Sequence, residues 1–320
     1  MPTKDKTKIL VLVGPTASGK SDLAVELALA LNGEIISADS RQVYVGLDIG
    51  TGKITREEMR GVPHHLLDVA DPRDRFTALD WKKLAEKAIH DIHARGKLPI
   101  ICGGTGFYIS TLIDDLGFPD VPADTAEQAR LEKQTPETLL AELATLDPKR
   151  AASIDPKNKR RLARAIVIAR ALGSVPAVTH PTDDEQKYDI TMIGLSLPDG
   201  ELKERIHRRL LQRLDAGMIR ECERLHAPAP AGTASSESKN LAPISLSYER
   251  MDELGLEYKY VAQYLQNKVT LAELTDILTA KIWQYARRQK TWFKKDTRIA
   301  WFHPREKEAI LKASEKLAQK

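Results

Sequence analysis

A phosphate-binding loop is the clearest chemical signature of this sequence. The segment GPTASGKS follows an apolar, β-branched run, KILVLVG, and precedes a helical pattern, SDLAVELALAL. It matches G-x-x-x-x-G-K-[ST] at every fixed position, between the strand and the helix that the motif requires. The backbone N–H groups of residues 17–20 are expected to bind a diphosphate or triphosphate, with the Lys20 ammonium beside it and the Ser21 hydroxyl on magnesium. The predicted loop consists of Gly14, Pro15, Thr16, Ala17, Ser18, Gly19, Lys20 and Ser21.

Two further polar residues follow the next expected strands. Asp39 comes at the end of GEIISADS, and Thr105 follows the apolar run in LPIICGGTG. Because parallel strands end at the same edge of a sheet, Asp39 is expected to face the crevice of the phosphate loop. Asp39 is open to other interpretations, namely a turn or helix cap and a magnesium carboxylate. Thr105 is equally compatible with a cap of the following helix.

A series of motifs along the chain is a more specific signature than the phosphate loop alone. In order along nearly the whole chain it contains GPTASGKSDLA, ISADSRQVYVGLDIGTGK, VPHHLLDV, KLPIICGGTGFY and ARRQKTWF. This series resembles that of the tRNA dimethylallyltransferase family. The resemblance implies transfer of a dimethylallyl group from dimethylallyl diphosphate to N6 of the adenine at position 37, beside the anticodon. The tRNAs concerned would read codons beginning with U.

The resemblance also implies roles for individual residues. The phosphate loop would hold the diphosphate with Mg²⁺, and Asp39 would accept the proton from N6. Thr16 would hydrogen-bond the bridging oxygen of the leaving group, and Thr105 would contact the tRNA. Arg205 and Arg209 lie four residues apart, a spacing suited to one shared anion, although a solvated helix face has the same spacing.

A basic stretch indicates where RNA would bind. Between Lys149 and Arg170 there are eight Lys or Arg residues and one acid, Asp155. An ordinary amphipathic helix with Leu162 buried is compatible with phosphate contacts on its outer face. Where the family commonly has an arginine, simple alignment gives Gln128, with Arg130 two residues later. The residues that the resemblance assigns to tRNA binding are Asp39, Ser40, Arg41, Gln42, Thr105, Gln128, Arg160, Arg161, Leu162, Ala163 and Arg164.

The elements that must position these residues form an alternating pattern. Strand-like runs alternate with helical segments in the first third, which predicts a parallel sheet flanked by helices in an α/β, P-loop NTPase-like fold. Residues 117–182 have only helical spacing, so they are predicted to be a helical, tRNA-binding insertion in a core of residues 1–116 and 183–320. A strand is expected at YDITMIGLSL, with long helices from there to the end and a loop-like segment at 228–247.

Composition narrows the class of protein. The 320 residues are 42% hydrophobic, which is enough for a large core, and the formal net charge is only +4. The two cysteines, Cys102 and Cys222, predict neither a disulfide framework nor a zinc site. No segment has the pattern of an export signal or membrane anchor, so a cytoplasmic protein without membrane contact is expected. The resemblance further suggests a monomer.

Other functions agree with part of this pattern. An adenylate isopentenyltransferase would use the same donor and base on a free nucleotide, but would not need the basic insertion. A P-loop phosphotransferase would account for GPTASGKS alone, and a non-catalytic RNA-binding protein would hold a nucleotide as a structural ligand. His64 and His65 are predicted to be structural. In RRQKTWFKK, Trp292 and Phe293 are predicted to anchor the core rather than to stack on bases.

Overall fold

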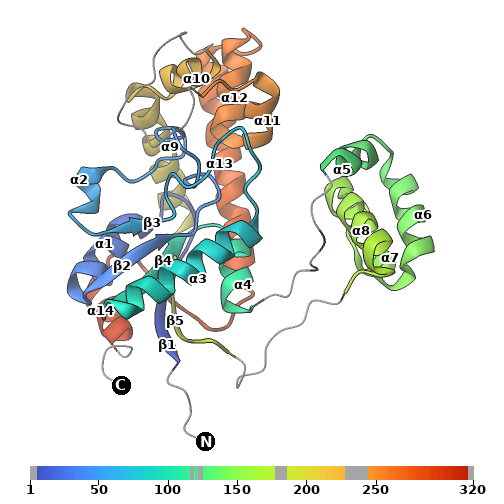
Figure 1. Ribbon diagram of the computed structural model, residues 1–320. Coiled ribbons are helices and arrows are strands. Elements are labelled where there is room, and N and C mark those ends of the chain that lie inside the picture. Colours follow the sequence, from blue (N-terminus) through green and yellow to red (C-terminus); the bar gives the residue numbers. More distant parts are fainter. Residues whose placement is uncertain are drawn as a thin grey trace, which may run out of the picture. The chain divides into compact units, whose positions relative to one another are not determined.

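The computed structural model describes residues 6–115, 119, 121, 125–176, 186–227 and 244–315, and its chain is shown in Figure 1. It divides into two compact units. One contains Met1–Asp114 and Glu185–Lys320, and the other contains Asp115–Asp184. The boundaries expected at 116/117 and 182/183 fall outside the described residues, as do residues 228–243 of the loop-like segment. The larger unit is called the core below, and the smaller one the insertion.

The core is built on a parallel sheet of six strands in the order β3-β2-β4-β1-β5-β6. The α/β class predicted from the alternating pattern is therefore confirmed. The strands are β1 (Thr7–Val13), β2 (Gly33–Ser37), β3 (His64–His65), β4 (Leu98–Gly103), β5 (Tyr188–Leu195) and β6 (Ile299–Phe302). The register pairs Val13 of β1 with Gly103 of β4, and Cys102 of β4 with Ser37 of β2. The carboxyl ends of these three strands thus lie side by side.

Helices cover both faces of the sheet. On β1, Leu10 and Leu12 pack with α1 (Lys20–Ala30) and α14 (Lys307–Glu315), whereas Ile9, Val11 and Val13 belong to the larger cluster on the other face. All five side chains are fully buried, which explains why β1 is a continuous apolar run without polar alternation. The other helices of the core are α2 (Arg56–Met59), α3 (Ala78–Ala94), α4 (Gly106–Ile113), α9 (Asp199–Asp215), α10 (Met218–His226), α11 (Tyr248–Leu254), α12 (Leu256–Leu265) and α13 (Leu271–Phe293).

The C-terminal part of the core differs from its expected helical structure. After α13, residues Ile299–Phe302 form β6, which pairs in parallel with β5 at the sheet edge. The expectation of helices to the end of the chain is wrong at this point. A strand of four residues whose Ala300 and Trp301 are exposed has no recognisable apolar period.

The insertion has its own hydrophobic core. In its described residues it contains α5 (Thr125–Glu132), α6 (Pro136–Leu146), α7 (Pro148–Ser153) and α8 (Lys159–Leu172). Leu131, Leu139, Leu143, Leu162 and Ile166 are completely buried within it. Each such side chain contributes about 1.5–3 kcal/mol of transfer free energy. None of the described helices of either unit is long and apolar enough to cross a membrane.

Candidate active site

The phosphate loop joins β1 to α1 and has the backbone of an anion-binding turn. Gly14, Ala17 and Gly19 have φ angles of 149°, 61° and 89°. At the start of α1 no side chain caps the helix, so its first N–H groups stay available for an anion. Lys20 Nζ donates a hydrogen bond to the Pro15 carbonyl at 2.7 Å. Burial lowers the pKa of Lys20 to about 8, although Cys102 and Asp39 oppose the shift.

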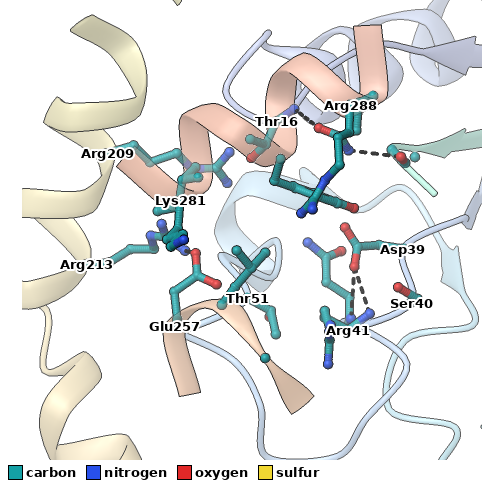
Figure 2. Close-up of a pocket in the computed structure, with 18 of the residues that line it drawn as sticks. Thr16, Asp39, Ser40, Arg41, Thr51, Arg209, Arg213, Glu257, Lys281 and Arg288 are labelled. Carbon is teal, nitrogen blue, oxygen red and sulfur yellow. Dashed lines mark hydrogen bonds and ion pairs between the residues drawn. The ribbon is translucent and has the colours of Figure 1, made fainter. Parts of the chain in front are cut away.

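Asp39 follows the carboxyl end of β2, and its side chain closes a turn there. Its Oδ1 accepts hydrogen bonds from the backbone N–H groups of Arg41 at 2.8 Å and Gln42 at 3.3 Å. The turn interpretation therefore applies to one carboxylate oxygen. The same side chain lines the main cavity of the core, as Figure 2 shows. An Asp39 carboxylate held by its own turn has a fixed direction, which suits a general base.

Thr105 supports this turn from the neighbouring strand. Its Oγ1 accepts a hydrogen bond from Ser40 N–H at 3.0 Å and donates one to Ser40 Oγ at 3.4 Å. Although Thr105 precedes α4, its side chain makes no capping bond to that helix. The helix-cap interpretation of Thr105 is therefore not what the structure shows.

Gln289 of α13 ties the phosphate loop to the end of β4. Its Oε1 accepts from Thr16 N–H at 2.8 Å, and its Nε2 donates to the Gly104 carbonyl at 2.9 Å. Figure 2 shows the first of these contacts as a dashed line that starts at Thr16. Sequence reasoning gave Gln289 no role, because nothing in RRQKTWFKK marks one polar residue over its neighbours. The two aromatics of that run also differ, since Phe293 is buried but Trp292 is 43% exposed.

A cavity of about 450 Å³ brings most of the predicted core residues together. A second cavity of about 380 Å³ also borders the loop and shares Lys20, Ser21 and Arg209 with the first. The predicted residues in the first cavity are Thr16, Lys20, Ser21, Asp39, Ser40, Arg41, Gln42 and Arg209. Those in the second are Ala17, Ser18, Gly19, Lys20, Ser21, Arg205 and Arg209.

The first cavity also contains cations that were not predicted. Arg213, Lys259, Lys281 and Arg288 line it. Arg213 continues the four-residue spacing of Arg205 and Arg209, so the sequence did carry a signal for it. Lys259, Lys281 and Arg288 come from α12 and α13, and no local pattern links them to the loop. The cavity therefore suits an anionic ligand larger than one diphosphate.

The two predicted arginines of α9 have different surroundings. Arg205 pairs with Glu201 at 2.9 Å. Arg209 donates from Nη2 to the Gly52 carbonyl at 3.1 Å, and burial, followed by the charge of Arg213, lowers its pKa. Arg209 is therefore a poorly solvated cation between the two cavities, where a diphosphate would gain most from it.

The histidine pair lies at the sheet edge. His65 Nε2 contacts Glu34 at 2.7 Å, and Arg95 and Lys97 reach the same carboxylate at 2.6 and 2.9 Å. Burial alone would raise the pKa of Glu34, but hydrogen bonds from Lys97, His65 and Arg95 lower it to about 2. This ion cluster joins β2, β3 and the segment before β4, which agrees with a structural role for His65.

The remaining candidates for tRNA binding belong to the insertion. Arg160 and Arg161 are exposed at the start of α8, while Arg164 is half-buried and donates to the Val121 carbonyl at 2.6 Å. Leu162 and Ala163 are completely buried, so their side chains support the helix and cannot contact an RNA directly.

Gln128 and Arg130, the two candidates for the family's arginine position, both lie on α5. Gln128 is half-buried on α5, and Arg130 makes a two-bond ion pair with Glu127 at 2.7 Å. Arg130 is therefore already neutralised within its own helix and is not presented as an unpaired cation.

A divalent cation would depend on few protein ligands. Within the described ranges, no three His, Cys, Asp or Glu side chains converge as a metal site. Ser21 lines both cavities at the start of α1. A hydroxyl beside phosphate oxygens and water fits Mg²⁺, which is usually held by substrate phosphates rather than by a complete protein cage.

Comparison with known proteins agrees with this geometry. Residues 42–296 match the family model described as IPP transferase. The chain is 39% identical to a tRNA dimethylallyltransferase of Halalkalibacterium halodurans over 93% of its length and 91% of that protein. For a tRNA dimethylallyltransferase of Bacillus subtilis the identity is 38%, over the same shares of each chain.

Solved structures give the same result. A tRNA isopentenylpyrophosphate transferase from Bacillus halodurans superposes with a TM-score of 0.68 at 37% identity, covering 98% of each chain. A eukaryotic dimethylallyltransferase acting on tRNA has a TM-score of 0.76, covering 98% of this chain and 80% of that one, and at 24% identity it shows the fold alone. On the family match and the identity to these relatives, this chain belongs to the IPP transferase family.

Proposed function

We propose that this protein transfers a dimethylallyl group from dimethylallyl diphosphate to N6 of the adenine at position 37 of tRNAs that read codons beginning with U. Diphosphate is released. The observation that carries this proposal is that the phosphate loop and the Asp39 carboxylate line one cavity. The named relatives act on tRNA, and the fold and family are shared with them. We further propose that the protein acts in the cytoplasm as a monomer.

The leaving group is stabilised at the phosphate loop. As the bond between the allylic carbon and the bridging oxygen breaks, charge develops on the diphosphate. The loop N–H groups, Lys20 and Arg209 face this charge, and Thr16 lines the cavity where its hydroxyl would meet the bridging oxygen. Mg²⁺ held by Ser21 and the phosphates would neutralise more of the charge.

The acceptor is activated at Asp39, which lines the same cavity. N6 of adenine forms a bond to the allylic carbon and must lose a proton to become neutral again. Asp39 accepts that proton through the oxygen that its turn does not use. An adenine stacked in an anticodon loop must first be extruded to reach a recessed cavity. The Asp39–Gln42 turn, held by Thr105, would meet the RNA where that adenine enters.

The insertion would hold the body of the tRNA. Arg160 and Arg161 are its exposed cations at the start of α8, and phosphate contacts of this kind give affinity without reading sequence. Thr105 and Gln128 complete the proposed tRNA contacts from the core and from α5. A free nucleotide would need none of these residues, so the basic insertion favours tRNA over AMP.

Transfer of label tests the reaction directly. Purified protein would receive radioactive dimethylallyl diphosphate, Mg²⁺ and unmodified tRNA, with AMP as a competing acceptor. We expect label on tRNA but not on AMP, and none on a transcript with guanine at position 37. Label on AMP alone would instead identify a nucleotide prenyltransferase. Absence of transfer to either acceptor, together with phosphate release in a parallel reaction given ATP, would contradict the proposal.

The structure suggests a variant that separates the role of Asp39 as general base from its role in the turn. Asp39→Asn keeps an oxygen that can accept the turn bonds of Arg41 and Gln42, whereas Asp39→Ala removes both functions. If Asp39 is the general base, the Asn variant should retain tRNA binding and lose about 10²–10⁴-fold in kcat. An Asn variant with the kcat of the unmodified protein would show that the carboxylate has only a turn role.

A further inference from the structure

Glu221 is a buried carboxylate that the chemistry above does not use. It lies on α10 with 2% of its surface exposed. Its Oε2 accepts from the backbone N–H groups of Asp48 at 3.1 Å and Ile49 at 2.7 Å, and its Oε1 accepts from Gly50 N–H at 2.9 Å. Tyr258 of α12 donates its hydroxyl to Oε1 at 2.8 Å. These donors are dipoles and none is a cation, so the loop itself stabilises the buried charge.

The Tyr258 hydroxyl stays protonated and so remains a hydrogen-bond donor in this cluster. Burial, and then the neighbouring Glu221 carboxylate, raise the pKa of Tyr258 well above its ordinary value. The phenol therefore keeps its proton and its hydrogen bond throughout the neutral pH range. Close packing fixes the loop as well, because a Cβ on Gly50 would lie 2.8 Å from the Tyr258 ring.

The opposite side of the same loop holds the arginines of the cavity. Arg213 Nη1 donates to the Gly50 carbonyl at 2.7 Å and to Glu257 at 2.8 Å. Arg209 Nη2 donates to the Gly52 carbonyl at 3.1 Å. Gly50 thus gives its N–H to Glu221 and its carbonyl to Arg213. A shift of the backbone at residues 50–52 would therefore move the carbonyl acceptors of both guanidinium groups.

We propose that Glu221 is a positioning residue for diphosphate binding. By fixing the N–H groups of residues 48–50, which we call the clamped loop, it sets the direction in which Arg213 and Arg209 face the cavity. The effect rests on the proposed function, in which Arg209 meets the diphosphate of the allylic donor; Arg213 lines the same cavity. Glu221 itself does not line either cavity in the described part of the chain.

Glu221→Gln tests this role without changing side-chain volume. An amide has one acceptor oxygen, so in either orientation its NH₂ group faces at least one N–H of the clamped loop. We expect the KM for dimethylallyl diphosphate to rise about tenfold or more while the Kd for tRNA stays within about twofold. Glu223→Gln, at an exposed position of the same helix, should leave both constants unchanged. Tyr258→Phe removes one donor but keeps the three backbone bonds, so its effect should be smaller.

Two results would overturn the proposal. One is an unchanged KM in Glu221→Gln, which would show that the clamped loop does not set the arginines. The other is a lower fraction of active protein with normal constants in the active part, which would indicate a purely structural role. Titration of active sites with labelled donor separates that case from a changed KM.

Pyrophosphate with Mg²⁺ provides a readout that is independent of tRNA. It should raise the Tm of the unmodified protein, and it should raise the Tm of Glu221→Asp by less than half as much, because the shorter carboxylate cannot reach all three N–H groups. This variant also serves if Glu221→Gln does not fold. Equal shifts in the two proteins would contradict the role of Glu221. If the unmodified protein binds pyrophosphate but transfers nothing to tRNA, the proposed function fails while the test of Glu221 still stands.

Discussion

Lys20 is a half-buried residue of the phosphate loop, and its charge changes with pH near pH 8. Burial lowers its pKa to about 8, so in the free enzyme the ammonium is present below that pH and is lost as pH rises through it. Because kcat/KM reports the free enzyme, kcat/KM for the donor should fall above about pH 8. Bound diphosphate favours the charged form, so the fall in kcat should come at higher pH.

The control for this prediction is Lys20→Arg, whose guanidinium does not titrate in this range. Its activity should be lower, but the alkaline fall of kcat/KM near pH 8 should disappear. The measurement is initial rate against donor concentration at pH 6.5 to 9.5. An unchanged alkaline limb in the arginine variant would assign the titration to another group.

At the residue scale, the sequence predicted those candidate site residues that belong to a continuous local motif. GPTASGKS and the Asp39–Gln42 segment are continuous, so their neighbours in sequence are also neighbours in the site. Gln289 and Glu221 reach the same region through packing of α13 and α10, and no spacing within those helices marks them. Such residues become visible only when the chain has folded, because Gln289 contacts Thr16 and Glu221 contacts Ile49 across more than 150 positions.

Between elements, the approach of α13 to α4 depends on Gly106. A Cβ there would lie 2.2 Å from Trp292 Cδ1 and 2.4 Å from Nε1. Gly106→Ala should therefore lower the free energy of unfolding by about 1–3 kcal/mol through overpacking. In a Trp292→Ala background the same change should have little effect, because the clashing ring is gone. Thermal or urea unfolding of the four proteins in this cycle measures the coupling.

Gly103 provides the matched control for that cycle. Its Cβ would lie 2.2 Å from the backbone oxygen of Ala38, at the closest approach of β4 to the segment after β2. Removing Trp292 cannot relieve a clash with backbone. Gly103→Ala should thus be equally destabilising in both backgrounds, and rescue of Gly103→Ala by Trp292→Ala would contradict this account.

The elements that the sequence predicted well are those buried on both faces. β1 and β4 are apolar runs, and α3 has a clear apolar stripe, since burial leaves a strong pattern. β3 has only two residues, and β6 has two exposed ones. Edge strands this short are fixed by pairing with a neighbour, which sequence periodicity does not record.

The molecule as a whole has a net charge of only +4, so RNA binding must depend on where charges lie. Many basic residues of the insertion are neutralised locally. Arg170 pairs with both Glu127 and Glu142, and Arg130 also pairs with Glu127. Arg160 differs, since its side chain is 71% exposed and its ion pair with Glu132 is long, at 3.8 Å. Among the described residues of the insertion, Arg160 and Arg161 at the start of α8 are thus exposed cations without a short ion pair.

Replacing Arg160 and Arg161 by Ala should weaken tRNA binding and lower its salt dependence. If each arginine contacts one phosphate, the slope of log K against log salt should fall by about one unit per arginine. Arg170→Gln removes a cation that two acids already hold, so it should leave the slope unchanged. Binding of unmodified tRNA at 50 to 300 mM salt measures the slopes, and the KM for the donor should not change in either variant. An equal loss of slope in Arg170→Gln would mean that net charge, rather than the two exposed arginines, holds the RNA.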